Sequence, residues 1–315
     1  MIIIEVAGGL GNQLQQYALY KSFLARGTDA ALDMTWFESN AQPGRTSGAI
    51  QRDSMLPVLV SEPFTVADKR MKEAVAGKDD LFSKAFRKLT GRSKVFTESG
   101  MFHPEIFSMT DCLLKGYFAC DAYYRGIFPE LRRIIRFPEC ADALTASKNE
   151  AVMEQMRDPS EASVSIHIRR GDYLDPVNAA LFGGICTDEY YEGAVLAVRQ
   201  ALKQRGDEKK LHFYVFSDDP EYAGSLHFGE KDESCTLIDW NSGANSIYDM
   251  MLMSCCRHNI SANSTFSFWG ARLNPDPEKI IVRPLKHKNT QDPDPDTMHR
   301  LWEGWILVDA RGTIY

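Results

Sequence analysis

The sequence lacks several features that would assign it to a function class directly. Its seven cysteines form no C-x-x-C pair and have no histidines at zinc-ligand spacing, and their number is odd. We therefore expect free thiols in a reducing compartment rather than disulfides or structural zinc. The chain also has no apolar run of about 18 residues and no secretory signal pattern at its start. These absences predict a cytoplasmic protein without a membrane-spanning helix.

An excess of basic residues is also missing. With 36 Lys and Arg against 43 Asp and Glu, the net charge is -7, which argues against a nucleic-acid partner. Any basic site must be local, and residues 81–96 form one such patch, with five basic residues and no acidic one. A solvated helix face is the simpler interpretation of this patch. The alternative is a peripheral contact with the anionic inner face of a membrane.

The length of 315 residues, with 44% hydrophobic and 25% charged residues, suits one large or two medium globular domains. A polar stretch at 156–162 contains Asp158-Pro159-Ser160 and predicts a domain boundary. The expected domains are therefore residues 1–157 and 158–315. Packing of the final segment back on the N-terminal domain is left open.

The N-terminal part begins with a strand pattern at 2–6, a glycine turn at 7–12 and a helical pattern. The turn has no Lys-Ser or Lys-Thr of a P-loop, and Leu14 stands where a dinucleotide fingerprint has its third glycine. Two interpretations remain: a purely structural turn, or a turn whose glycines let a ligand approach the helix amides beside Asn12. Residues 30–33 and 113–118 are further predicted strands.

The C-terminal part has a regular alternation. Strand patterns at 163–168, 211–216, 235–238, 258–262 and 279–282 alternate with helical patterns at 188–204, 245–256 and 265–273. Such alternation predicts an α/β domain in which helices cover a parallel sheet.

Polar clusters follow three of these strands. Arg169-Arg170-Gly171-Asp172 follows the first strand, Ser217-Asp218-Asp219 the second, and Asn263-Ser264-Thr265-Phe266-Ser267 the fourth. Each cluster alone could be a solvated loop. Because parallel strands end at one edge of a sheet, the three should lie together, where arginines and helix-terminal amides suit the phosphates of a nucleotide. The pattern predicts a nucleotide diphosphate site.

Taken together, these motifs resemble glycosyltransferase family 11, the bacterial-type α-1,2-fucosyltransferases. The resemblance runs over nearly the whole chain in the order of the family. The matching motifs are Gly8-Gly9-Leu10-Gly11-Asn12-Gln13 with Gln16-Tyr17-Ala18, His167-Ile168-Arg169-Arg170-Gly171-Asp172-Tyr173, Phe216-Ser217-Asp218-Asp219 and Asn263-Ser264-Thr265-Phe266-Ser267, with weaker matches at Gly116-Tyr117-Phe118 and 249–256.

The resemblance implies a GT-B fold of two Rossmann-like domains whose parallel sheets face a central cleft. It implies inverting transfer of L-fucose from GDP-β-L-fucose to the 2-hydroxyl of a galactoside, in the synthesis of a surface glycan or oligosaccharide. The N-terminal domain would hold a galactose-containing acceptor, which could be lipid-linked, and the C-terminal domain would hold GDP-fucose. GDP-fucose is a co-substrate, and no cofactor or metal is expected.

Residue roles follow from the same resemblance. Arg169 would hold the β-phosphate, Asp172 and Asn12 would complete the catalytic set, and Asp218 and Asp219 would lie at the nucleoside. Ser264, Thr265 and Phe266 would hold the pyrophosphate. The implied donor-binding residues are His167, Arg169, Arg170, Ser217, Asp218, Asp219, Asn263, Ser264, Thr265, Phe266, Gly9 and Gly11.

The identity of a general base is open on the sequence alone. Asp172 is the first candidate and Asp33 the second, and a loose transition state without a strong base is the third. Asp172 could instead hold Arg169 or Arg170 by a salt bridge. The chain departs from the family pattern at Leu14-Gln15, Ala119-Cys120, Phe268 and Arg272, mostly in the acceptor half, so the acceptor is the least defined part of the prediction.

Alternatives to this function come from two classes. One is a GT-B transferase that uses another nucleotide sugar, and the other is a non-catalytic nucleotide- or sugar-binding protein. The acidic run Asp292-Pro293-Asp294-Pro295-Asp296 resembles the Asp-x-Asp motif of metal-dependent transferases. It is interrupted by prolines and does not follow a predicted strand, so a solvated turn is the better interpretation.

Overall fold

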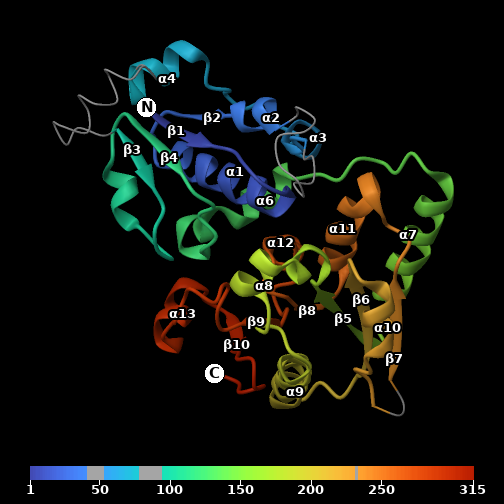
Figure 1. Cartoon of the computed structure of the whole chain (residues 1–315). Coiled ribbons are helices and arrows are strands. Elements are labelled where there is room, and N and C mark those ends of the chain that lie inside the picture. Colours follow the sequence, from blue (N-terminus) through green and yellow to red (C-terminus); the bar gives the residue numbers. More distant parts are fainter. Residues whose placement is uncertain (41–52, 78–93, 231–232) are drawn as a thin grey trace. The chain divides into compact units, whose positions relative to one another are not determined.

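The computed structural model describes residues 1–40, 53–77, 94–230 and 233–315. These residues form two compact units, Met1–Arg136 (unit 1) and Phe137–Tyr315 (unit 2), and in each of them helices cover a parallel sheet (Figure 1). The predicted α/β class with two parallel sheets is confirmed. Most of the basic patch at 81–96 lies outside the described residues.

Unit 1 contains a four-stranded sheet in the order β2-β1-β4-β3, with every strand parallel to its neighbour. Helix α1 connects β1 to β2, as the glycine turn and the helical pattern predicted. The predicted strand at 113–118 stops at Lys115, because Gly116 and Phe118 adopt φ of +153° and +48° and leave the extended conformation. The elements of unit 1 are β1 (Ile2–Glu5), α1 (Leu10–Ala25), β2 (Ala30–Asp33), α2 (Thr35–Asn40), α3 (Leu56–Leu59), α4 (Lys69–Ala76), β3 (Val95–Thr97), β4 (Cys112–Lys115) and α6 (Phe128–Ile134).

Unit 2 contains a six-stranded parallel sheet in the order β10-β9-β8-β5-β6-β7. Counted within the unit, this is the strand order of the doubly wound nucleotide-binding fold, and it reverses between β5 and β8. The strands are β5 (Glu161–Ile168), β6 (Lys210–Ser217), β7 (Ser234–Ile238), β8 (His258–Ile260), β9 (Ile281–Pro284) and β10 (Trp305–Val308). The last of these was not predicted.

The helices of unit 2 agree well with the predicted patterns. Two of them have the predicted bounds, and the pattern at 245–256 divides into a 3₁₀ turn at Gly243–Ser246 and a helix. The helices are α7 (Ala143–Met156), α8 (Pro176–Phe182), α9 (Asp188–Gln204), α10 (Pro220–Ser225), α11 (Ile247–Cys255), α12 (Thr265–Leu273) and α13 (Pro295–Leu301). Among the described residues, no helix combines the length and the apolar character that crossing a membrane requires.

The alternating side chains of β5 and β6 supply both faces of the unit 2 core. Ile166 and Val215 pack in the cluster that contains α9, whereas Tyr214 and Phe216 pack in the cluster that contains α7 and α11. The serines of β5 are buried in the covered sheet, and Ser165 Oγ accepts a 2.7 Å hydrogen bond from Asn259 Nδ2. β5 is therefore covered on both faces.

The two units divide between Arg136 and Phe137, earlier than the boundary expected at 157/158. The reason is α7, which joins unit 2 through a pair of 3.0 Å hydrogen bonds between the amides of Asn149 and Asn241 and through apolar packing on α11. The final segment also belongs to unit 2. Its last residue, Tyr315, donates a backbone hydrogen bond to Leu307 in β10.

The same amide pair holds a carboxylate whose ionisation should affect stability. Asn241 Nδ2 donates to Asp249 Oδ1 at 2.9 Å, and burial raises the pKa of Asp249 to about 7. Since this pKa lies above that of the unfolded chain, the folded protein retains the proton between about pH 4 and pH 7. The resulting stability is present below pH 4 and is lost as the pH rises through 7. As the pH rises through 7, we expect the free energy of unfolding to decrease by about 2 kcal/mol, after allowance for solvent at this half-buried group.

Urea unfolding of the parent and of Asp249→Asn at pH 5 and pH 7.5 measures this contribution. Asparagine does not ionise, so the free energy of unfolding of Asp249→Asn should not show the decrease that ionisation of Asp249 causes in the parent. Buried His258, whose pKa is lowered to about 4, gives the opposite pH dependence, but it is present in both proteins and cancels in the comparison. An equal pH dependence in the two proteins would contradict the prediction.

Candidate functional site

The candidate site lies at the carboxyl edge of the unit 2 sheet, where the strand order reverses. β5 and β8 are adjacent and parallel. Ligands of open parallel sheets bind beyond the carboxyl ends of the strands at such a reversal. The three polar clusters follow β5, β6 and β8 as predicted, so they share this edge.

Arg169 is held between two carboxylates. Its Nη2 lies 2.6 Å from Asp172 Oδ1 and its Nη1 lies 2.7 Å from Asp218 Oδ2. The guanidinium also lies 5.6 Å from the ring centre of Tyr173. The two carboxylates fix the side chain, and because it is 26% exposed it remains accessible to a ligand. A guanidinium has more N–H donors than these two contacts use, and the others suit a phosphate.

Strand register explains why Arg169 meets Asp218, which lies 49 positions away in the sequence. β5 and β6 pair in parallel, with Ile168 opposite Ser217. The next residue on each strand is therefore Arg169 on one side and Asp218 on the other. The two loops form one charged surface because the strands end at the same level.

Arg170 is fixed by the same loops. Its Nε lies 3.0 Å from Asp219 Oδ2, and its guanidinium lies over the Tyr222 ring at 3.7 Å. Asp219 also caps α10, because its Oδ1 accepts from the backbone N–H of Tyr222 at 3.1 Å. The sequence did not indicate Tyr222 as part of the site. Its position three residues after a capping aspartate is the signal that could have located it.

Gly171 allows the close approach of the β5 and β6 loops. A Cβ atom at this position would lie 2.3 Å from Asp218 Oδ2, too close for any side chain without a shift. Backbone N–H of Arg170 also donates to Asp218 Oδ1 at 2.8 Å. Asp218 is thus held by both arginines, and the glycine makes room for it.

His167 is buried and neutral, and its predicted role in donor binding stays a prediction. It is 6% exposed, and burial, with Arg169 nearby, lowers its pKa to about 3. Its backbone oxygen accepts from Tyr191 Oη at 3.0 Å, and its ring lies 5.8 Å from that of Phe266. His167 therefore connects the end of β5 to the first turn of α12.

Asn263 uses its side chain to shape the loop between β8 and α12. Its Nδ2 donates to the backbone oxygens of Phe182 and His287 at 3.1 and 3.2 Å, and its Oδ1 accepts from Cys186 Sγ. Tyr173 Oη donates to the backbone oxygen of Asn263 at 3.0 Å, so the loops after β5 and β8 are joined directly.

The N-terminus of α12 follows this loop. Ser264 is its N-cap residue and is 8% exposed, and within the described residues its side chain makes no capping hydrogen bond. The backbone N–H groups of Thr265, Phe266 and the following residue start the helix. Such groups, with the helix dipole, favour an anion.

The remaining predicted residues belong to unit 1. Gly9 is the N-cap of α1, and its backbone oxygen accepts from the N–H groups of Asn12 and Gln13 at 3.0 Å. Gly8 has φ of +85°, and a Cβ there would lie 2.7 Å from Asn12 Nδ2. Gly11 is buried within the helix. These contacts give the glycine turn a structural role, and its predicted ligand role stays a prediction.

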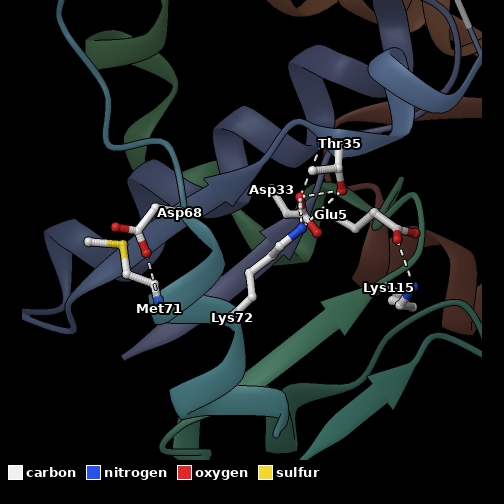
Figure 2. Close-up of polar contacts among 7 residues, drawn as sticks. All are labelled: Glu5, Asp33, Thr35, Asp68, Met71, Lys72 and Lys115. Atoms are coloured by element: carbon white, nitrogen blue, oxygen red, sulfur yellow. Dashed lines mark hydrogen bonds and ion pairs between the residues drawn. The ribbon is translucent and has the colours of Figure 1, made fainter. Parts of the chain in front are cut away.

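Asp33, the second candidate base, is engaged by its neighbours. Its Oδ1 accepts from Thr35 N at 3.1 Å, from Thr35 Oγ1 at 2.7 Å and from Lys72 Nζ at 3.1 Å (Figure 2). The side chain is 6% exposed. These contacts give Asp33 a positioning role at the end of β2.

In the described part of the chain, no group of three or more His, Cys, Asp or Glu side chains is arranged to hold a metal ion. In the acidic run at 292–296, all three aspartates are exposed. Asp294 caps α13 by accepting from Thr297 N at 2.9 Å. The run therefore has a helix-capping role.

Comparison with known proteins gives matches along the whole chain. The model of glycosyl transferase family 11 matches residues 108–304. An α-1,2-colitosyltransferase of Escherichia coli is 29% identical over 98% of this chain and 99% of its own. The O-antigen biosynthesis glycosyltransferase WbnK of Escherichia coli is 37% identical over 39% of this chain and 38% of its own. Among solved structures, a mutant of Arabidopsis thaliana FUT1 in complex with GDP has a TM-score of 0.47 and 13% identity, over 93% of this chain and 72% of that chain.

The family match covers more than half of the chain. It includes the three strand-end clusters of unit 2, from His167 to Ser267, and begins at residue 108 in unit 1. These clusters are three of the motifs on which the resemblance in the sequence rested, and the glycine motif at 8–18 lies outside the matched residues. The chain is a glycosyltransferase and belongs to glycosyl transferase family 11.

Proposed function

We propose that this glycosyltransferase transfers L-fucose from GDP-β-L-fucose to the 2-hydroxyl of a galactoside, with inversion and formation of an α-1,2 linkage. The observation that carries the proposal is Arg169, held between Asp172 and Asp218 at the reversal of the unit 2 sheet. Family membership supplies the reaction class. The donor and the linkage are the proposed part.

The reaction separates charge at the bond that breaks. Negative charge develops on the departing GDP, and positive charge develops on the sugar ring. Arg169, fixed before the reaction, would stabilise the leaving diphosphate without rearrangement, and the amides that start α12 would contribute in the same way. In this proposal the protein provides these charges itself, without a metal ion.

The acceptor end of the proposal is supported by the relatives. One relative is named for an α-1,2 linkage, and the other is named for O-antigen biosynthesis. We therefore propose a galactose-containing surface glycan, assembled in the cytoplasm and carried on a lipid, as the acceptor.

A second donor is favoured by the relative that matches almost the whole chain, which is named as a colitosyltransferase. Colitose is L-fucose without the 3-hydroxyl group. A site that hydrogen-bonds this hydroxyl should reject the deoxy sugar strongly, whereas a site that packs apolar atoms there should discriminate weakly. The choice between the two donors thus depends on one contact.

Release of GDP from GDP-fucose, GDP-colitose and GDP-mannose, measured with a panel of galactosides, tests the proposal. We expect turnover with GDP-fucose and an NMR spectrum of the product that shows substitution at the galactose 2-hydroxyl with the α anomer. Higher kcat/KM with GDP-colitose would select the second donor. Tight GDP binding without turnover of any donor would indicate a non-catalytic binding protein and contradict the proposal.

A further inference from the structure

A hollow lies in unit 1, at the carboxyl edge of its sheet. Glu5 ends β1 and Asp33 ends β2, and the two residues are paired in register. Beyond them a hollow with a volume of about 470 Å³ is lined by Glu5, Thr35, Trp36 and Glu38. This volume is within the usual range of small-ligand sites, ~300–1,000 Å³.

Two ion pairs hold the walls of this hollow in place. Lys115 Nζ lies 2.7 Å from Glu5 Oε2, and Lys72 Nζ lies 3.1 Å from both Asp33 Oδ1 and Thr35 Oγ1 (Figure 2). The lysines come from the end of β4 and from α4, so that different parts of unit 1 fix the polar side chains. A polar site that is fixed before binding loses less entropy when a ligand arrives.

Trp36 supplies an aromatic surface in the same hollow. Its ring lies 5.1 Å from the buried ring of Phe37, at an interplanar angle of 84°. This edge-on contact restrains the orientation of the indole, which is itself only half-buried. The hollow thus combines a restrained aromatic ring with carboxylates.

We propose that this hollow binds a hexopyranose ring of the acceptor glycan. The apolar C–H face of the sugar would stack on Trp36, and its hydroxyls would donate to Glu5 and Glu38, because carboxylates only accept hydrogen bonds when they are ionised. Lys115 neutralises Glu5, so Glu38 leaves one net negative charge in the lining, which disfavours phosphate and other anions and favours an uncharged sugar as the occupant. The inference rests on the proposed function for its occupant, a galactoside, but its contacts lie within unit 1.

Kinetics with GDP-fucose and methyl β-galactoside test this subsite. We expect Trp36→Ala and Glu5→Gln each to raise KM for the galactoside at least about tenfold, a loss typical of a well-packed hydrogen-bonding or aromatic contact. The KM for GDP-fucose, donor hydrolysis in water and the melting temperature should stay at the parent values. Trp36→Phe keeps an aromatic ring and should stay within about threefold of the parent.

Glu62→Gln is a matched control. Glu62 is a half-buried glutamate of unit 1 that is paired with Lys21 and Arg133, outside the hollow. It should leave KM for the galactoside unchanged. A galactoside KM in Trp36→Ala and Glu5→Gln equal to that of Glu62→Gln would overturn the inference.

Saturation-transfer NMR with methyl β-galactoside alone separates this inference from the proposed donor. A signal from the parent that disappears in Trp36→Ala supports the subsite even if GDP-fucose is not turned over. Equal signals from both proteins, or no signal from the parent, would refute the subsite whatever the donor is.

Discussion

Arg169→Ala is expected to lower kcat/KM for sugar transfer about a thousandfold and to leave the fold intact. Removal of one preorganised donor to developing charge costs roughly 10²–10³ in rate, and Arg169 is also proposed to bind the diphosphate in the ground state. Initial rates of GDP release, with circular dichroism and melting temperature as tests of folding, measure the effect. GDP affinity, measured by calorimetry, should fall as well.

Two further variants make this test specific. Arg169→Lys retains the positive charge but loses the planar fork that contacts both Asp172 and Asp218, so it should recover only a small part of the activity. Arg199→Ala removes an arginine of the same unit that is paired with Glu233, and it should leave activity within about twofold. Folded Arg169→Ala with activity within about tenfold of the parent would rule out the proposed role.

The parts of the fold that the sequence predicted are those with local signals at both ends. Helix α9 shows this well. Thr187 caps it by accepting from Tyr190 N at 3.1 Å, Asp188 and Glu189 lie in its first turn, and Gly206 follows its end with φ of +69°. Each of these signals can be recognised within a few residues, and both predicted bounds are correct.

The parts that the sequence did not predict depend on contacts between distant segments. β10 has four residues, Trp305–Val308, and forms a strand because it pairs with β9 and packs with α9. The division between the units escaped prediction for the same reason. A polar stretch at 156–162 resembles a linker, but the bonds of Asn149 to Asn241 tie the preceding helix to unit 2.

The candidate site contains both kinds of feature, those with a local sequence signal and those that depend on contacts between distant segments. The positions of the polar clusters followed from the strand patterns, since each cluster begins where apolar alternation stops. The contacts between the clusters could not be predicted in this way. Arg169 meets Asp218 only because the strand register sets Ile168 opposite Ser217. Register between two buried strands depends on packing of the whole sheet, which one segment of sequence does not record.

Asp172 can be assigned a role by comparing two substitutions. Its Oδ1 lies 2.6 Å from Arg169 Nη2, a short charge-assisted contact that holds the guanidinium in place. We therefore expect Asp172 to be a positioning residue for Arg169. Asp172→Ala should lower kcat/KM about a hundredfold and weaken GDP binding, because the guanidinium loses one of its two supports.

Asp172→Asn separates positioning from base catalysis. Asparagine keeps an oxygen that can accept from Arg169 but has almost no basicity, so a positioning role predicts a loss of only about tenfold and an unchanged pH profile of kcat/KM. Loss of a base predicts that Asn is as inactive as Ala, that GDP affinity stays normal and that the acidic limb of the profile disappears. Measurement of both variants from pH 5 to pH 9 distinguishes the two outcomes, and the second would return Asp172 to the role of general base.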